Sequence, residues 1–269
     1  NMTEQLDLFL SVAKKAATEA CKIQMEYFDK EKQISTKSTE TDIVTQVDLL
    51  CQEAIIKIIK QEFPDHGFLA EEEDVDETND SGYVWVIDPV DGTVNYANGI
   101  PLFCVSIGLR KGNEMLVGVV FSPVLNEMFW AAKGQGAYLN GKKISVSKTS
   151  KLVNSVIGTG FAYDKDTNHD NNTKEFCAVT KRIRGVRRLG SAAIDLVYVA
   201  CGKLEGYWEL IIKPWDIAAG VLILEEAGGL ATDLHGNKLQ FKTKTSIIAT
   251  NNHIYNKLSK LLTEVRGGE

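Results

Sequence analysis

Apolar residues recur every three or four positions over two stretches near the start of the chain, which is the spacing of helices with one apolar face. The first stretch covers residues 6–20. The second covers residues 42–62, and Pro64 follows it, a residue that cannot continue a helix. Residues 30–41 between them are polar and show no period. The pattern therefore predicts two helices joined by a polar loop.

From residue 83 onward the pattern changes to short runs of β-branched and aromatic residues, which are typical of strands. In the middle third these runs cover residues 84–87, 104–109, 117–121 and 128–131. Turn residues separate the later runs. We therefore expect an antiparallel sheet that packs against the two early helices.

The last third alternates between strand-like and helix-like segments, as βαβ units do. Strands are expected at 156–159, 186–189, 206–210 and 246–250, and helices from about residues 192 and 216 and at 252–265. A polar stretch, 142–154, precedes this series. We therefore expect an N-terminal α+β half over residues 1–145 and a C-terminal α/β half over residues 146–269.

Composition and charge narrow the class of protein. The chain carries 36 acidic and 30 basic residues, a net charge of −6, which argues against nucleic-acid binding driven by charge. Its longest apolar run, residues 217–224, is too short to cross a bilayer. Five scattered cysteines without a C-x-x-C pair indicate reduced thiols, so we expect a cytoplasmic protein without a membrane partner.

The densest chemical signal is the sequence WVIDPVDGT at residues 85–93. Asp88 follows a buried strand, Asp91 lies three positions later, and Gly92 lets the backbone approach a ligand closely. Carboxylates this close raise each other's pKa or bind a metal, and ligands that are all oxygen favour Mg²⁺. The alternative is a plain turn, because Asp, Pro and Gly are all turn residues.

Other acidic residues occupy positions from which they could join this pair. Glu71 and Glu72 end a short apolar segment, and Asp216 opens a helix, where backbone donors favour anions. Glu209 ends a strand, and Asp48 lies on the second helix. The four histidines lie far apart in the sequence and show no ligand spacing.

Through these motifs the chain resembles the inositol monophosphatase family of Mg²⁺-dependent, lithium-sensitive phosphomonoesterases. The family's central motif, Asp-Pro-aliphatic-Asp-Gly-Thr after an aromatic and aliphatic run, is met at residues 85–93. Its other motifs are met, in order, by EE at 71–72, RLGSAA at 188–193, WDIAAG at 215–220 and EAGG at 226–229. The resemblance implies a layered αβαβα sandwich, of class α+β or α/β, that forms a homodimer.

The resemblance also implies a metal site with two or three Mg²⁺ ions. Glu71, Asp88 and the backbone carbonyl of Val90 would hold one ion. Asp88, Asp91 and Asp216 would hold a second, and a looser third ion would share Glu71. Such an arrangement turns a water into a nucleophile and stabilises the leaving oxygen of a phosphate ester.

The remaining family positions concern the water and the substrate. Thr93 would orient the water, with Asp48 accepting a hydrogen bond from its hydroxyl. The backbone donors of Gly92 and Thr93 would hold the phosphate at the start of a short helix. Glu209 would accept hydrogen bonds from polyol hydroxyls. The substrate pocket would thus be lined by Gly92, Thr93, Ala192, Glu209 and Asp216.

Some positions leave two interpretations open. Glu72 would orient Glu71, or is only a loop charge. Lys37 and Asp42 match a mobile segment that family members place over the active site, or lie in an ordinary exposed loop. The basic cluster at residues 181–188 is a solvated surface, a subunit contact, or a site for a second anionic group of the substrate.

The first functional hypothesis is a Mg²⁺-dependent phosphatase that acts on inositol monophosphate or a similar small polyol phosphate. The same chemistry would also serve fructose 1,6-bisphosphate, histidinol phosphate, 3′-phosphoadenosine nucleotides or NADP, because leaving-group recognition comes from variable loops. A hypothesis of another class is a regulatory or scaffold protein that keeps the fold, which the basic cluster motivates.

Overall fold

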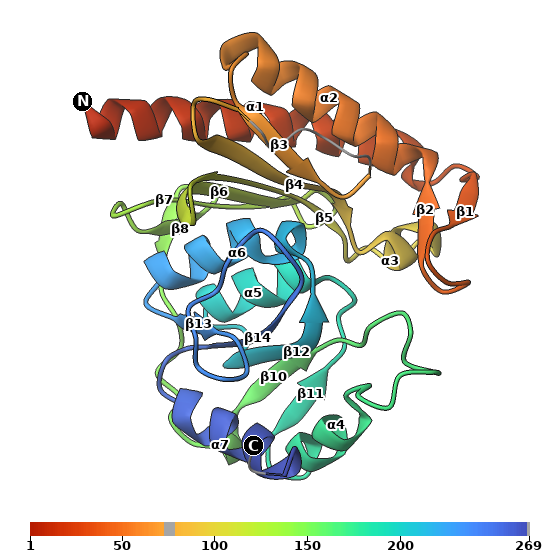
Figure 1. The fold of residues 1–269 in the computed structure, drawn as a ribbon, viewed down its shortest axis with the longest axis vertical. Helices are drawn as coiled ribbons and strands as arrows, with labels where there is room; N and C mark the ends of the chain where they lie inside the picture. Colours follow the sequence, from red (N-terminus) through yellow and green to blue (C-terminus); the bar gives the residue numbers. More distant parts are fainter. Residues whose placement is uncertain (73–78, 268–269) are drawn as a thin grey trace.

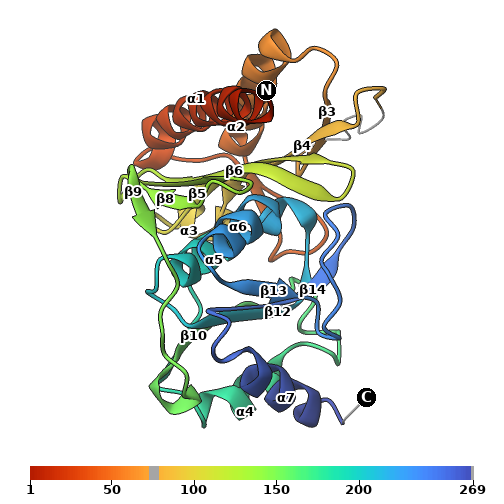
Figure 2. The ribbon, with the colours of Figure 1, turned by 90° about the vertical axis from the view of Figure 1, so that its left-hand side faces the viewer.

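The computed structural model describes residues 1–72 and 79–267, and its elements stack in five layers (Figures 1 and 2). Helices form the two outer layers and the central one, and a sheet lies in each gap. The αβαβα sandwich expected from the resemblance is therefore confirmed. From one end to the other, the helical layers are α1 (Met2–Phe28) and α2 (Gln46–Glu62), then α5 (Ala192–Ala200) and α6 (Pro214–Glu226), then α4 (Thr173–Thr180) and α7 (Tyr255–Val265).

The first sheet has seven strands in chain order. They are β3 (Gly67–Ala70), β4 (Tyr83–Asp91), β5 (Cys104–Lys111), β6 (Glu114–Ser122), β7 (Glu127–Ala132), β8 (Ala137–Leu139) and β9 (Lys142–Ile144). From β4 onward every neighbouring pair is antiparallel, as the alternating runs and turns predicted. The pair β3 and β4 is parallel, and β3 was not among the strands expected from the sequence.

The second sheet has the order β11-β10-β12-β14-β13. Its strands are β10 (Val156–Thr159), β11 (Gly185–Arg187), β12 (Gly206–Ile212), β13 (Leu230–Thr232) and β14 (Thr245–Thr250). The βαβ expectation is right for β10, β11 and β12, which pair in parallel. It is wrong for β14, which runs antiparallel to β12 and β13. The first sheet ends at Ile144 and the second begins at Val156. We therefore keep as a proposal the division into halves at residue 145.

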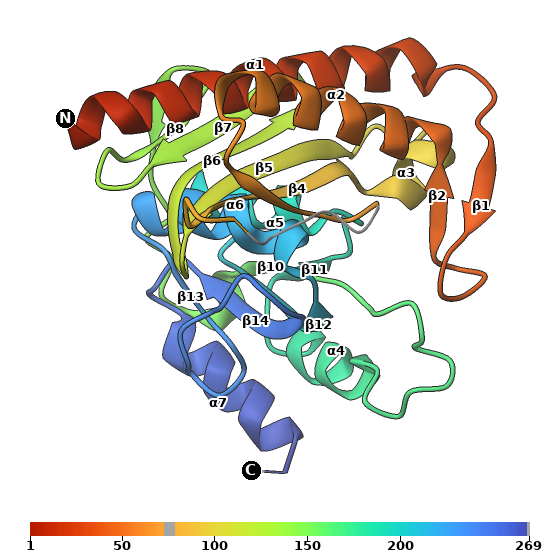
Figure 3. The same ribbon diagram turned by 45° about the horizontal axis from the view of Figure 1, so that its top comes forward.

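The segment expected to be a polar loop contains a two-stranded hairpin. Its strands, β1 (Ile34–Thr36) and β2 (Ile43–Thr45), pair antiparallel and project beside the short helix α3 (Thr93–Ala97) (Figure 3). Helix α2 consequently begins at Gln46 rather than at residue 42, because Thr45 caps it and accepts a hydrogen bond from the Val47 amide. The pattern also missed α4, which has only two turns.

Helix α6 packs directly on the first sheet, against β4, β5 and β6. Two glycines, Gly108 and Gly118, lie opposite each other in β5 and β6 beneath it. A Cβ atom at Gly118 would lie 2.9 Å from the Ala219 backbone, and one at Gly108 would lie 3.2 Å from the Ala219 nitrogen. The missing side chains thus set how closely the helix approaches the sheet.

In the described part of the chain, no helix combines the length and the apolar composition needed to cross a membrane.

Candidate active site

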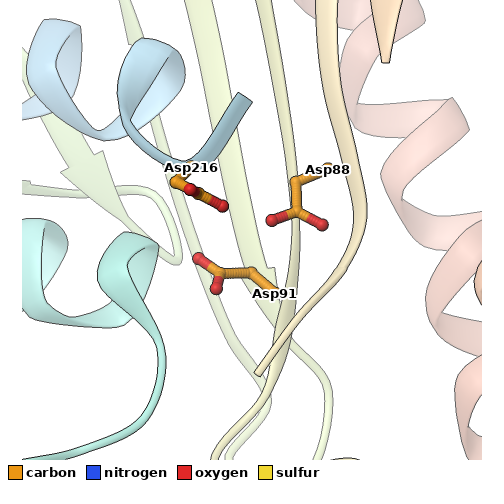
Figure 4. Close-up of side chains that lie close together, drawn as sticks. All are labelled: Asp88, Asp91 and Asp216. Carbon is orange, nitrogen blue, oxygen red and sulfur yellow. The ribbon is translucent and has the colours of Figure 1, made fainter. Parts of the chain in front are cut away.

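Three aspartates from two layers meet where the end of β4 faces the first turn of α6. The pairing of β4 with β5 shifts register between Asp88 and Asp91, which is the irregularity of a β-bulge. Asp216 comes from the first turn of α6, where its carboxylate accepts a hydrogen bond from the Lys213 amide at 3.1 Å. One carboxylate oxygen from each aspartate lies within 4.8 Å of the others. Figure 4 shows the three side chains pointing toward one another.

The electrostatics of this group, the aspartate cluster, are unfavourable without a cation. Asp88 and Asp91 are 1% and 6% exposed, and burial and neighbouring carboxylates raise the pKa of both well above the usual value. Burial and the charge of Glu71 raise the pKa of Asp216 to about 7. Among the described residues, the buried Oδ1 atom of Asp88 has no hydrogen-bond partner. An all-oxygen cluster with an unpartnered ligand atom fits a hard divalent cation.

Glu71 and Glu72 follow β3 and share the ammonium group of Lys37. The Lys37 Nζ atom lies 3.0 Å from Glu71 Oε1 and 2.5 Å from Glu72 Oε1. Glu71 lies outside the 4.8 Å group, but its charge raises the pKa values of Asp88 and Asp216. Glu72 is buried, and its amide donates to Gln52 Oε1 at 2.9 Å. Gln52 carried no motif that would have revealed this contact.

Lys37 and Asp42 take different positions, although the sequence placed both in one segment. Lys37 reaches the acidic residues, whereas Asp42 closes the turn of its own hairpin. The Asp42 carboxylate accepts a hydrogen bond from the Ser38 hydroxyl at 2.6 Å, and its carbonyl accepts one from the Lys37 amide at 2.7 Å. The structure therefore brings Lys37, and not Asp42, into contact with a carboxylate of the site.

Thr93 opens α3 and lies between two acceptors. Its Oγ1 atom is 3.0 Å from Asp48 Oδ1 and 3.1 Å from the carbonyl oxygen of Val90. The other carboxylate oxygen of Asp48 accepts hydrogen bonds from the amide and the hydroxyl of Thr45, which fixes the group. Gly92, before Thr93, has φ +93°, and a Cβ there would lie 2.9 Å from the Leu102 carbonyl oxygen. This tight turn accordingly requires glycine.

The start of α5 is tied to the aspartate cluster. The Ala193 amide donates to Asp91 Oδ2 at 2.7 Å, and Ser191 caps the helix by accepting from the Ile194 amide. Ala192 lies between these two anchors. The structure therefore places the expected substrate segment directly beside Asp91.

Glu209 lies on β12 in a space left open by Gly160, the residue that follows β10. It accepts a hydrogen bond from the Tyr207 hydroxyl at 2.7 Å, and burial raises its pKa to about 7. A Cβ at Gly160 would lie 2.0 Å from Glu209 Oε1. A Cβ at Gly158 would lie 2.3 Å from Oδ1 of Asp195, a second buried acid that our sequence analysis missed. Two glycines two positions apart, Gly158 in β10 and Gly160 just after it, were the available signal.

These shifts predict how the stability of the metal-free protein depends on pH. The pKa values of Asp216 and Glu209 rise from 3.8 and 4.5 to about 7 on folding. Between those limits the folded protein holds protons that the unfolded chain has released. Each group therefore lowers the free energy of unfolding by about 1.4 kcal/mol per pH unit as pH rises. His66, whose pKa burial lowers, acts oppositely but is a single group.

We expect the melting temperature in EDTA to fall by several degrees between pH 5.5 and pH 8, measured by thermal unfolding at constant ionic strength. The variant Asp216→Asn should show a shallower slope, because it lacks one of the titrating groups. A melting temperature that stays level or rises over this range would contradict the assigned shifts.

Comparison with known proteins identifies the family. The family model described as the inositol monophosphatase family matches residues 5–266. An inositol-1-monophosphatase from Synechocystis sp. is 45% identical over 257 residues, covering 96% of this chain and 89% of the relative. A Nus factor SuhB from Pasteurella multocida is 41% identical, covering 84% and 85%. The structure of an inositol monophosphatase from Anabaena (Nostoc) sp. matches with a TM-score of 0.88 at 43% identity, with 97% of each chain covered. The chain therefore belongs to the inositol monophosphatase family.

Proposed function

We propose that this chain is a Mg²⁺-dependent phosphatase that hydrolyses inositol monophosphate or a similar small polyol phosphate. The observation that carries the proposal is the convergence of three aspartates from β4 and α6, with the buried Asp88 Oδ1 atom left without a partner in the described chain. Relatives named inositol-1-monophosphatase support the choice of substrate. As a member of this family, the chain is a phosphomonoesterase.

The proposed ligands are the carboxylates and one carbonyl already described. Glu71, Asp88 and the Val90 carbonyl would hold one Mg²⁺, and Asp88 would share a second with Asp91 and Asp216. A third ion would share Glu71, in competition with the ammonium group of Lys37 at 3.0 Å. When bound, such ions make water more acidic and neutralise the charge of the ester.

The chain itself would orient the attacking water through Thr93. A hydroxyl carries one hydrogen, so Thr93 Oγ1 donates to Asp48 or to the Val90 carbonyl, and not to both at once. When it donates to Asp48, its lone pairs remain to accept a hydrogen bond from the water. Asp48 is held by Thr45, so the direction of the hydroxyl is set before substrate arrives.

Recognition of the polyol is assigned to Glu209 and the first turn of α5. Glu209 is 9% exposed and already bound to the Tyr207 hydroxyl, which restricts its rotation. A carboxylate accepts hydrogen bonds, and a polyol hydroxyl supplies the donor. The backbone beside Ala192 and the amides of Gly92 and Thr93 would complete the pocket around the ester.

The test of this proposal is phosphate release from inositol 1-phosphate. We expect release with Mg²⁺, none with excess EDTA, recovery on adding Mg²⁺ back, and inhibition by Li⁺. Release that EDTA leaves unchanged would refute the mechanism. Comparing kcat/KM for inositol 1-phosphate, fructose 1,6-bisphosphate, histidinol phosphate, 3′-phosphoadenosine nucleotides and NADP would decide between the substrates.

A second candidate function is regulation through a partner. One relative is named Nus factor SuhB, and the basic cluster at residues 181–188 has exposed arginines. In the described part of the chain, the guanidinium groups of Arg182 and Arg187 donate to backbone carbonyls and that of Arg184 donates to Asn154, so these charges remain available to a partner. A pull-down with the wild type and with an Arg184→Glu/Arg187→Glu variant tests this role. Failure of the wild type to retain a stable partner would count against it.

Assembly and location are proposed on narrower grounds. We propose a homodimer, on family membership alone, and light scattering of the purified protein would measure its mass. We propose a cytoplasmic location, because all five cysteines are free, as expected in a reducing compartment.

A further inference from the structure

A buried amide side chain of α1, that of Gln24, contacts the first sheet beside the aspartate cluster. Gln24 is fully buried, and the other buried residues of this helix, all of which lies in the described chain, are apolar residues and Cys21. The Gln24 Nε2 atom lies 2.9 Å from the carbonyl oxygen of Pro89 and 3.3 Å from that of Cys104. An amide group carries two hydrogens, so Gln24 donates one to each carbonyl.

The two carbonyls lie at the β-bulge that separates Asp88 from Asp91. In this interval β4 has two residues, Pro89 and Val90, whereas β5 has one residue between the partners of the two aspartates. A bulge interrupts the ladder of hydrogen bonds and changes the direction of the side chains beside it. Gln24 therefore supplies donors to backbone carbonyls at the point where the regular pairing of β4 with β5 is lost.

The backbone of Gln24 holds the other end of the same segment. The hydroxyl of Tyr96, a buried residue of α3, donates to the Gln24 carbonyl oxygen at 2.7 Å. Helix α1 lies along the first sheet, with its C-terminal part toward α3 (Figure 3). One residue of α1 is thus bonded to the chain both before Val90 and after Thr93, so the segment that carries the proposed ligands is attached at two points.

Packing alone does not account for a glutamine at this position. Its Oε1 atom is buried and has no hydrogen-bond partner among the described residues. Burying an unpaired polar atom costs free energy, and a methionine of similar length would fill the space without that cost. Methionine would lack the two hydrogen bonds to the bulge. The contacts with Pro89 and Cys104 therefore explain the residue type.

We propose that Gln24 is a positioning residue of the metal site: its amide group holds the bulge of β4 in the shape that directs Asp88 and Asp91 toward each other. The proposal rests on the proposed function for the identity of the cation and its ligands. Gln24 acts through the backbone of Pro89 rather than as a ligand. Removing an outer contact of this kind typically lowers metal affinity by about 10- to 100-fold.

The proposal is tested with Gln24→Met, which keeps the length of the side chain and removes both donors. We expect the dissociation constant of Mg²⁺, measured by calorimetry without substrate, to rise at least about tenfold. At saturating Mg²⁺, kcat for inositol 1-phosphate should change less than about threefold, because every proposed ligand remains. The matched control is Gln5→Met, the same change at an exposed position of α1, which should leave both quantities unchanged. Equal Mg²⁺ affinity in Gln24→Met and the wild type would overturn the proposal.

Hydrogen exchange of the metal-free proteins separates a local role from a general loss of stability. In Gln24→Met, peptides that cover residues 88–96 should exchange at least about tenfold faster, and peptides that cover β14 should exchange as in the wild type. A uniform acceleration over the whole chain would contradict a positioning role.

A measurement on the wild type does not depend on how well a variant folds. By NMR, the side-chain amide protons of Gln24 should exchange with solvent more slowly than those of the exposed Gln5. Equal exchange at the two side chains would show that the bonds to Pro89 and Cys104 do not persist in solution, and the proposal would fail.

Mg²⁺ binding also separates this proposal from the proposed function. If the wild type binds Mg²⁺ but releases no phosphate from inositol 1-phosphate, the proposed function fails, and weaker Mg²⁺ binding by Gln24→Met still supports the role of Gln24. Phosphate release together with equal Mg²⁺ affinity in the two proteins overturns only the role of Gln24. If the wild type binds no Mg²⁺, both proposals are overturned.

Discussion

Asp91→Asn is expected to lower kcat/KM for inositol 1-phosphate by at least about a thousandfold. The substitution keeps the size of the side chain and leaves an oxygen that can accept the Ala193 amide, now at 2.7 Å from Asp91 Oδ2. It removes one of the three charges that face each other within 4.8 Å. Metal-based stabilisation of a transition state is worth several kcal/mol, and about 4 kcal/mol corresponds to a thousandfold.

The same variant should fold at least as well as the wild type in EDTA. Burial raises the pKa of Asp91, so its ionised form costs folding free energy at pH 8, and the amide does not ionise. Loss of activity together with an equal or higher melting temperature would separate a ligand role from a structural one. The control is Asp233→Asn in the turn after β13, where activity should stay within about twofold. Asp91→Asn activity within tenfold of the wild type would contradict the proposed ligand set.

Thr93→Val is expected to lower kcat by about a hundredfold to a thousandfold, with little change in KM. Valine has nearly the shape of threonine, so the fold is kept while the hydroxyl that lies 3.0 Å from Asp48 is lost. The expected size is that of a group that positions a proton or a nucleophile in the transition state. Because substrate contacts remain, the loss should appear in kcat rather than in KM.

Asp48→Asn provides the internal check on that interpretation. If Asp48 acts only by directing the Thr93 hydroxyl, the double variant Thr93→Val/Asp48→Asn should be about as slow as the slower single variant. Steady-state kinetics of the three variants decide the matter. Losses that multiply in the double variant would mean that the two residues act independently.

Much of the fold follows from apolar periodicity, and the exceptions have physical reasons. Helices α1 and α2 each bury one face, and strands β4 to β6 are buried over most of their length, so both leave an apolar pattern in the sequence. The hairpin of β1 and β2 has an exposed first strand, and no apolar alternation marks it. Strand direction depends on where the connections cross, which is why the antiparallel direction of β14 was not expected.

For the site, the sequence names the residues but does not show how close they lie in space. The ordered motifs name Asp88, Asp91 and Asp216, but their convergence depends on how α6 lies against the sheet. Gln52, whose side chain accepts a hydrogen bond from the Glu72 amide, belongs to no motif, so residue type alone could not reveal it. Asp195 was hidden for a related reason, since the space it occupies is created by Gly158 of a neighbouring strand.

The glycine pair that packs against α6 limits which substitutions this enzyme can accept during evolution. Gly108 and Gly118 make the seam between helix and sheet one methyl group thinner than alanines would allow, and Asp216 stands one turn from the contact at Ala219. The packing of the interior therefore sets the distance between Asp216 of α6 and the two aspartates of β4. A single added methyl group between helix and sheet would change that distance without altering any of the three proposed ligands.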